Sequence, residues 1–425
     1  MIIQTIEDLK KYLKDYNFVY FLFISFCLGS FFINFSILIC LLIFVIKFKL
    51  IKIYIDQFKV IFYLSIFFWV ILFISSIINS TEDLKNIFKS FAYIRFIILP
   101  LVIIYMLERV NKKKFIVFIN AIIFFLIFDI LFQFHFKVDI FGYKLENLGN
   151  PRMDRISGFF GDELVAGTYL SLFGFTALFL LKELKQFQNK LFLFLYLILI
   201  ISAIIITGDR IGILFIVGIL LFNFIFNKKL RKFFVISSLV FVLVGTFLIK
   251  SNEKLSYRYI ENINSITGTN VFNNPTYKSF LNTPWISHYL VSLEMIKDKS
   301  FLGFGYKGFR KYCNQYADLE KRSSYKYKCT SHPHNTYFEI IVETGLLGLF
   351  LFIFFNLLIF VKVLKSKSQI ILLLYSVIFT ILNPFRPSGS FFTTWNAGIF
   401  WMLIGILMYY LFVNQNNEKN KDLNS

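Results

Sequence analysis

The chain has 425 residues, of which 57% are hydrophobic and 20% aromatic, and its mean hydropathy is +0.68. This composition excludes an ordinary soluble globular protein and predicts an all-α, polytopic integral membrane protein that lies among membrane lipids. The formal net charge of +20 would favour nucleic-acid binding in a soluble domain. In a membrane chain, basic residues first serve to orient the spans, so we expect no nucleic-acid partner.

The apolar segments predict about twelve transmembrane helices in a single transmembrane domain, residues 1–425. The uncharged run from Phe18 to about Ile46 is long for one span and short for two. Gly29, Ser30 and Asn34 favour a tight turn within it, so we expect two short helices. The other spans are expected at about 59–79, 91–107, 115–134, 164–181, 191–207, 211–226, 233–249, 336–361, 369–385 and 390–413.

The basic residues fit a topology with both chain ends in the cytoplasm, because the lysine-rich loops then all lie inside. This topology places residues 135–163 and a large loop, residues 250–335, on the periplasmic side. Within the large loop, Thr283 and Pro284 should begin an amphipathic helix that ends near Ser300 and lies on the membrane surface. Residues 47–59 should form a cytoplasmic loop.

The stretch HPHNTYFEIIVETGLLG, residues 332–348, joins a polar loop to a long apolar helix. Thr336 and Glu339 have the spacing of a capping box, which predicts a helix start at Thr336, just after His334 and Asn335. The free N–H groups of a helix start favour anions and disfavour a protonated imidazole. We therefore expect His334 to be neutral near pH 7. Gly345 and Gly348 should let a neighbouring helix approach closely.

Several arginines should lie at the outer edge of the membrane: Arg152, Arg155, Arg210 and Arg258. Arginine binds phosphate through paired hydrogen bonds. Each arginine could instead anchor the chain at the interface or pair with a nearby acid, namely Asp162, Glu163 or Asp209. Together with a neutral histidine on the outer side, where nucleotides are absent, the arginines favour a lipid substrate that carries pyrophosphate.

Gly303, Gly305 and Gly308 spell G-x-G-x-x-G, but no strand precedes them, so a dinucleotide site is excluded. A glycine-rich turn is the plainer interpretation, and a backbone nest for phosphate is the alternative. We expect no metal site, because His332, His334 and Cys329 lack a fourth ligand, and we expect no cofactor.

The two cysteines of the large loop, Cys313 and Cys329, could form a disulfide if that loop lies in an oxidising compartment. His288, on the predicted surface helix, and His135, at the end of a span, are interpreted as interfacial side chains.

His334 and Asn335, followed by nine residues and then by Gly345 and Gly348, match the H-N-x9-G-x-x-G pattern of the bacterial O-antigen ligase and O-antigen polymerase family. The segments FLGFGYKGFRKYC, TGDRIG and RISGFFGDELVAGTYLS also resemble companion segments of that family. The resemblance covers roughly residues 155–413. It implies a GT-C-like fold and an enzyme of the bacterial inner membrane whose active site faces the periplasm.

The resemblance further implies a metal-independent, inverting transfer of a preassembled glycan from undecaprenyl pyrophosphate to an acceptor. His334 would be the catalytic histidine and Arg210 would hold the pyrophosphate, with Arg258 as a looser match. Arg155, Asn335 and Glu339 are further candidates for substrate binding. Asp209 departs from the family pattern, which commonly has a small residue before the arginine, and it could neutralise Arg210.

We favour an O-antigen ligase that uses the lipid A core as acceptor, because the histidine motif is intact. A polymerase that extends a growing glycan is the alternative within the family. A protein O-oligosaccharyltransferase and a lipid-linked glycan flippase are the weaker alternatives.

Overall fold

The computed structural model describes residues 14–79, 84–144, 155–261, 284–317 and 329–424. These ranges are almost entirely helical and contain no strand beyond an isolated bridge between Val138 and Lys144. Six helices are long and apolar enough to cross a membrane; a bent pair and five shorter apolar helices bring the described part of the chain to the expected twelve segments. The prediction of an all-α polytopic membrane protein is confirmed.

The first predicted hairpin is present. Helices α2 (Phe18–Leu28) and α3 (Ser30–Ile46) pack against each other, and Gly29 separates them with a φ of 97°. The N-terminal half continues through four spans or parts of spans: α5 (Lys59–Asn79), α6 (Leu84–Ala92), α7 (Ile94–Arg109) and α8 (Lys112–Phe136).

The prediction of a loop at residues 47–59 is wrong, because this segment contains helix α4 (Phe48–Gln57), bent by 94° from α3. Ile51 and Tyr54 of α4 are buried, whereas Lys49 and Lys52 are exposed. Such an amphipathic helix lies across the end of the bundle and does not extend the span.

The rest of the chain adds the remaining spans and the elements of the large loop. The middle spans are α9 (Ala166–Tyr169), η4 (Leu170–Gly174), α10 (Phe175–Leu181), α11 (Lys190–Ile206), α12 (Arg210–Phe226) and α13 (Arg231–Ser251). The large loop contains α14 (Glu253–Ser256), η7 (Tyr257–Glu261), α17 (Pro284–Asp298) and α18 (Gly308–Ala317), and the last spans are α19 (Thr336–Lys365), α20 (Gln369–Ile381) and α21 (Thr394–Asn424). Helix α17 confirms the helix expected after residue 283. It packs against α18 and α19 and buries His288, Val291 and Met295, and its position on the membrane surface stays a prediction.

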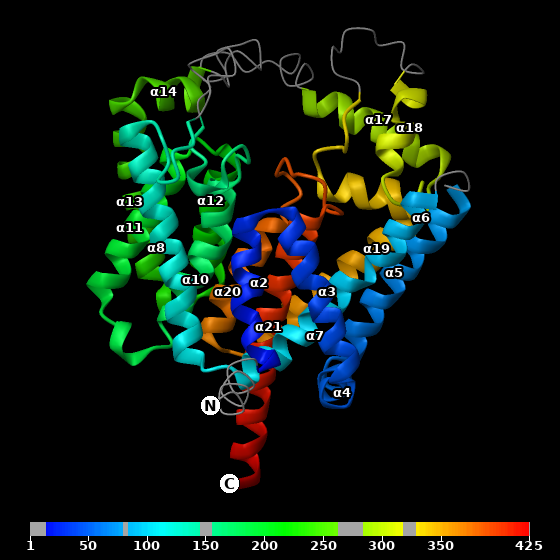
Figure 1. The fold of residues 1–425 in the computed structure, drawn as a ribbon, viewed down its shortest axis with the longest axis horizontal. Coiled ribbons are helices and arrows are strands. Elements are labelled where there is room, and N and C mark those ends of the chain that lie inside the picture. Colours follow the sequence, from blue (N-terminus) through cyan, green and yellow to red (C-terminus); the bar gives the residue numbers. More distant parts are fainter. Residues whose placement is uncertain (1–13, 80–83, 145–154, 262–283, 318–328, 425) are drawn as a thin grey trace, which may run out of the picture.

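Helices α7 and α21 run side by side through the centre of the bundle (Figure 1). Every side chain of α7 from Phe96 to Leu107 is buried. Helices α8 and α10 to α13 stand on one side of this centre, and α5, α6 and α19 stand on the other. The bundle therefore has two lateral groups of helices that meet at α2, α3, α7, α20 and α21.

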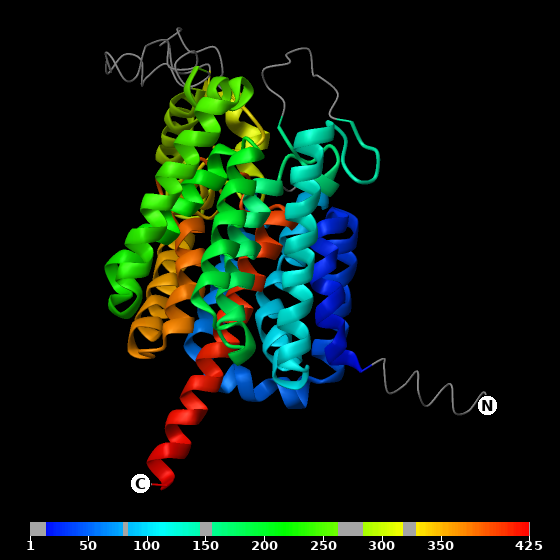
Figure 2. The same cartoon turned by 90° about the vertical axis from the view of Figure 1, so that its left-hand side faces the viewer.

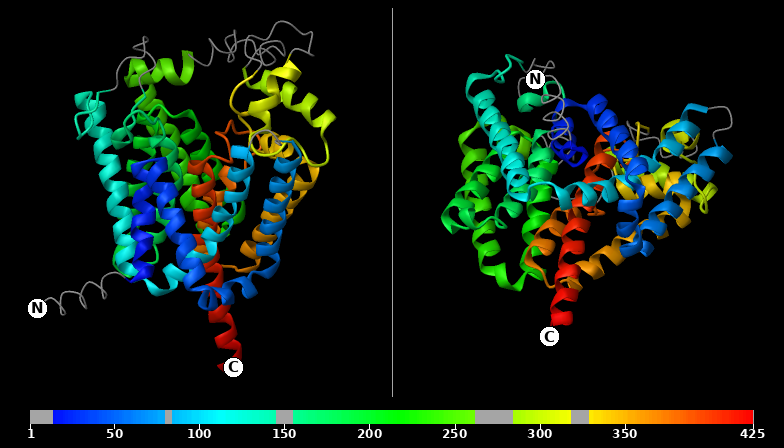
Figure 3. Two further views of the ribbon diagram at one scale, coloured as in Figure 1. Left: turned by 45° about the vertical axis from the view of Figure 1, so that its right-hand side comes forward. Right: turned by 60° about the horizontal axis from the view of Figure 1, so that its bottom comes forward.

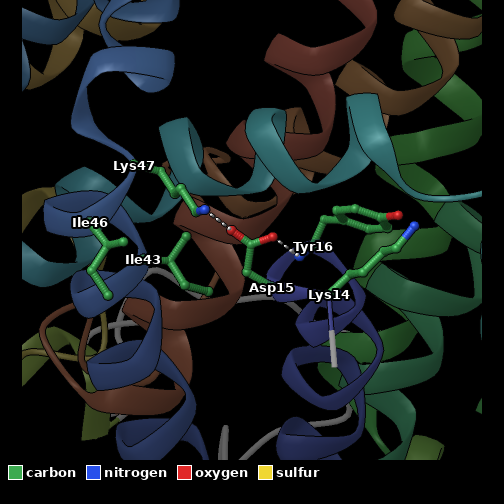
Figure 4. Close-up of a pocket in the computed structure, with 6 residues that line it drawn as sticks. All are labelled: Lys14, Asp15, Tyr16, Ile43, Ile46 and Lys47. Atoms are coloured by element: carbon green, nitrogen blue, oxygen red, sulfur yellow. Dashed lines mark hydrogen bonds and ion pairs between the residues drawn. The ribbon is translucent and has the colours of Figure 1, made fainter. Parts of the chain in front are cut away.

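The two ends of the bundle differ in character. Helices α14, α17 and α18 lie at one end of the bundle, and the last turns of α21 project from the opposite end (Figures 2 and 3). The first of these ends is called the histidine end, because His334 lies there just before α19. At that opposite end, Asp15 pairs with Lys47 at 3.5 Å beside the bend between α3 and α4 (Figure 4). Lys112 likewise pairs with Glu183 at 3.0 Å. The predicted lysine-rich loops thus gather at the end opposite His334.

Candidate functional site

Helix α19 is broken near its start, and another segment of the chain fills the break. Gly345 has a φ of 68° and a ψ of −173°, which is not helical. The carbonyls of Val342 and Glu343 accept hydrogen bonds from the N–H groups of Phe304 and Gly305 at 2.8 and 2.9 Å. In return, the N–H of Leu346 donates to the carbonyl of Ser300 at 2.8 Å. Segment 300–305 therefore replaces the hydrogen bonds that the break removes from the helix.

This crossing explains the glycines of two motifs. A Cβ on Gly345 would collide with the Phe301 carbonyl, and a Cβ on Gly303 would lie 2.5 Å from the Val342 carbonyl. The prediction that Gly345 lets a neighbouring helix approach is thus wrong, since its neighbour is an irregular segment of turns and bends. The phosphate nest is also wrong, because the N–H groups of Phe304 and Gly305 are already bonded to α19.

The start of α19 is capped by Asn335, whose side-chain oxygen accepts from the N–H groups of Tyr337 and Phe338 at 2.9 and 3.2 Å. The predicted capping box is wrong. The Glu339 carboxylate instead accepts from the Ser390 hydroxyl at 2.5 Å and from the Phe391 N–H at 2.6 Å. Glu339 is only 2% exposed, so it fixes the loop between α20 and α21 against the start of α19.

The same loop holds the histidine segment. The Ser388 N–H donates to the His334 carbonyl at 2.8 Å, and the Ser388 carbonyl lies 3.2 Å from Nε2 of His332. Nδ2 of Asn335 donates to the Pro384 carbonyl at 2.7 Å. The Asn335 side chain is thus engaged in positioning the loop, and its binding to substrate stays a prediction.

Three imidazoles cluster here. The His334 ring centroid lies 4.2 Å from that of His332 and 5.6 Å from that of His288, which belongs to α17. Burial and the neighbouring His334 lower the pKa of His332 to about 4. Burial, followed by repulsion from His288, also lowers the pKa of His334, and a hydrogen bond with the Ser388 backbone opposes this shift. His334 is therefore neutral near pH 7, as expected, but burial is the main cause.

His288 was predicted to be an interfacial side chain, and this is wrong, because only 2% of it is exposed. A disulfide joins Cys313 of α18 to Cys329. Cys329 stands three residues before His332, so the disulfide ties α18 to the segment that carries the histidines.

The arginines form a second cluster around the turn between α11 and α12. Nε of Arg258 donates to the Gly208 carbonyl at 3.1 Å, and Arg155 pairs with Asp209 at 3.3 Å. A Cβ on Gly208, whose φ is 71°, would lie 3.6 Å from Arg258 and 3.8 Å from Arg155. Arg210 follows directly as the first residue of α12. Three predicted residues are thus brought together, whereas Arg152 lies outside the described residues.

The cluster carries more positive than negative charge. Asp209 pairs with Arg155 and accepts from the Thr168 hydroxyl at 2.8 Å. Within the part of the chain that the structure describes, Arg210 makes no hydrogen bond or ion pair. Burial and repulsion from Arg155 lower the pKa of Arg210, and attraction to Tyr259 and Asp209 opposes this shift. Burial lowers the pKa of Arg258 to about 10, and repulsion from Arg210 and Arg155 adds to the shift. Close guanidinium groups with one carboxylate favour a bound polyanion.

Arg386, in the loop between α20 and α21, connects the two clusters. Its guanidinium lies over the Phe215 ring of α12 at 4.8 Å. Burial lowers the pKa of Arg386 to about 10, and attraction to Asp209 and Tyr337 opposes this shift. Arg386 was not among the predicted site residues. The sequence feature that could have identified Arg386 as a site residue is its position between Pro384 and Pro387, in a short loop between two spans.

Part of the chain resembles a known protein family. Residues 195–353 match the family model described as O-antigen ligase. This segment of the chain is therefore similar to the O-antigen ligase family. A search of curated proteins found no match. Members of this family are glycosyltransferase-like enzymes that use lipid-linked glycans.

The O-antigen ligase match runs from α11 to the middle of α19, so it includes Arg210, Arg258, His288 and the His334 segment. Arg155 and the loop between α20 and α21 lie outside it. The contacts of Asp209 and Glu339 described above connect these outer parts to the matched domain.

The break in α19 gives a test of the scaffold. Gly345→Ala places a side chain in a conformation that is essentially restricted to glycine and costs about 1–3 kcal/mol, before the collision with Phe301 is counted. We expect a clearly lower unfolding temperature in detergent, measured by tryptophan fluorescence. Gly245→Ala is the matched control, because its Cβ would lie 3.7 Å from Ile205, an ordinary contact. Equal stability of the two variants would contradict the role of Gly345.

Proposed function

We propose that the protein is an O-antigen ligase that moves a preassembled glycan from undecaprenyl pyrophosphate to the lipid A core. In this proposal the protein lies in the inner membrane and the reaction takes place at the histidine end, which faces the periplasm. The transfer inverts the configuration of the anomeric carbon and uses no metal. The observation that carries it is the pairing of a neutral histidine cluster with a cationic arginine cluster, connected by one loop. The assignment of residues 1–425 to one transmembrane domain, with loop 250–335 inserted, is part of the same proposal.

His334 acts as the general base. One nitrogen of its ring forms a hydrogen bond with the Ser388 backbone, and burial keeps the imidazole neutral. A free ring nitrogen takes the proton from a hydroxyl of the acceptor sugar while that oxygen forms the new bond to the anomeric carbon. His332 and His288 pack around the ring and fix its orientation, so they are positioning residues.

The arginine cluster receives the leaving group. As the bond between the anomeric carbon and the pyrophosphate oxygen breaks, its electron pair stays on the pyrophosphate and adds negative charge there. Arg210 and Arg258 stabilise this charge, and Arg155 supports the turn through its pair with Asp209. The proton on His334 then passes to solvent, and the enzyme returns to its starting state.

A ligase and a polymerase need the same donor and the same base, so the acceptor distinguishes them. Loss of a ligase leaves undecaprenyl-linked polymer and a bare lipid A core. Loss of a polymerase leaves a core that bears a single repeat, and loss of a flippase leaves the donor on the cytoplasmic face. Analysis of glycolipids from a strain that lacks the protein decides among the three.

His334→Ala removes the base, and general-base catalysis contributes about 10²- to 10⁴-fold. We expect glycan transfer by purified protein to fall by that factor, with unchanged yield in the membrane. His135→Ala is the control, because His135 is exposed at the end of α8. Transfer by His334→Ala at the wild-type rate would exclude His334 as the base.

The pH dependence follows from the lowered pKa of His334. Only the neutral imidazole accepts a proton, so transfer should be constant near pH 7 and fall with acid below the ordinary histidine pKa of about 6.5. His288→Gln removes a repelling neighbour, and the acid limb of kcat should move to higher pH. An acid limb that stays in place in this variant argues against coupling between His288 and His334.

Arg210→Lys keeps the positive charge but loses the paired hydrogen bonds to pyrophosphate. We expect the KM for the donor to rise roughly tenfold and to become more sensitive to salt, with little change in the KM for the acceptor. Lys250→Gln, which alters an exposed charge at the same end of the bundle, is the control. An unchanged donor KM in Arg210→Lys would show that Arg210 does not hold the pyrophosphate.

A further inference from the structure

A second cationic site lies on the other side of the bundle, in a groove of about 880 Å³. The groove opens between α3 and the adjoining ends of α6 and α7, and segments 306–307 and 393–395 complete it. None of its described lining residues belongs to the arginine cluster. It is therefore a separate site at the histidine end.

The polar wall of the groove carries Lys89, Arg95 and Lys307, and no Asp or Glu is among the described residues that line it. Burial lowers the pKa of Lys307, and repulsion from Lys89 and Arg310 adds to the shift. The carboxylates of Glu339 and Glu343 attract Lys307, but they belong to α19, outside the groove. The groove itself is complementary to an anion.

Arg95 is held by a single side-chain hydrogen bond among the described residues. Its Nη2 donates to Oδ1 of Asn34 at 2.9 Å, and the Thr394 hydroxyl donates to the same oxygen at 3.2 Å. Nε of Arg95 is buried and has no hydrogen-bond partner among the described residues. A buried donor without a partner costs about 1–3 kcal/mol, so the Arg95 guanidinium keeps hydrogen-bonding capacity beyond its bond to Asn34.

The opposite wall is apolar and faces away from the protein. Phe31, Phe35 and Leu38 of α3 are 75%, 47% and 54% exposed, and their spacing places them on one face of the helix. This face leads from the first turn of α3, next to the polar wall of the groove, towards the middle of the span. Trp395 adds an aromatic ring to the groove, as is usual at the membrane interface. A free anion would use only the charges, whereas a lipid would use both walls.

We propose that this groove binds a membrane lipid whose head group carries phosphate. The phosphate lies among Lys89, Arg95 and Lys307, and an acyl or isoprenyl chain lies along Phe31, Phe35 and Leu38. In the proposed transferase, this lipid would be the membrane anchor of the acceptor. The acceptor role rests on the proposed function, whereas the lipid-binding site does not. Thr393 of the groove is the last residue of the loop that carries Ser388 and Arg386, so the acceptor anchor and the donor site lie on two sides of one loop.

The test measures binding of dioleoyl phosphatidic acid to the full chain in neutral detergent by native mass spectrometry. The double variant K89Q/K307Q changes two side chains that are not part of the hydrophobic core. Two lost charges should weaken binding at this site roughly tenfold to thirtyfold. K250Q/K297Q is the matched control, since both lysines are exposed at the same end. Arg210→Gln identifies any lipid held by the arginine cluster, which K89Q/K307Q leaves intact.

Weaker binding in K89Q/K307Q, with wild-type binding in K250Q/K297Q, supports the site. Equal binding in both overturns it, as does an equal loss for zwitterionic dioleoyl phosphatidylcholine. Inorganic phosphate that binds as tightly as phosphatidic acid would overturn the lipid assignment.

The acceptor role has its own readout, because K89Q/K307Q should raise the KM for the acceptor and leave that for the donor unchanged. A rise in the donor KM alone would overturn that role. Absence of transfer by the wild-type protein would count against the proposed function, and the binding result would still decide the lipid site.

Discussion

The break of α19 at Gly345 and the segment that fills it are the constraint on which the histidine end depends. In a membrane, an unsatisfied peptide group costs several kcal/mol, so a broken span persists only where other protein groups replace its hydrogen bonds. Segment 300–305 does so, and it leads directly from α17 into α18. The position of His288 beside His334, and of the disulfide before His332, follows from this one crossing.

The spans were predictable because long uncharged runs have few alternatives in a membrane, and Gly29 indicated the turn in the first of them. Helix α4 was missed because its lysines, which stay exposed while Ile51 and Tyr54 are buried, resemble an orienting loop. The break at Gly345 was missed because an apolar run indicates a span but not its continuity. The partners of Glu339 are about fifty residues away in the chain, so its local spacing suggested a capping box that does not form.

The candidate site was predictable in its residue types and only partly in its pairing. The resemblance to the O-antigen ligase family indicated His334, Arg210 and Arg258, and the structure brings Arg155 to the same turn as the two arginines. Sequence proximity suggested that Asp209 pairs with Arg210. In the folded protein Asp209 forms an ion pair with Arg155 instead. This pair could not be predicted, because residues 155 and 209 meet only when the segment before α9 packs on the turn between α11 and α12.

The charges at the histidine end also bear on how two lipid substrates could meet. Two phosphorylated head groups repel each other, and at physiological salt this repulsion is screened only beyond about 8 Å. A transferase that joins the sugars of two such lipids therefore needs a separate cationic site for each. The arginine cluster and the groove at Lys307 meet this requirement, and the loop between α20 and α21 contributes Arg386 beside the first and Thr393 to the second. In the proposed reaction, that loop would hold the two anchors apart while the neutral His334, bonded to the same loop, acts on the sugars between them.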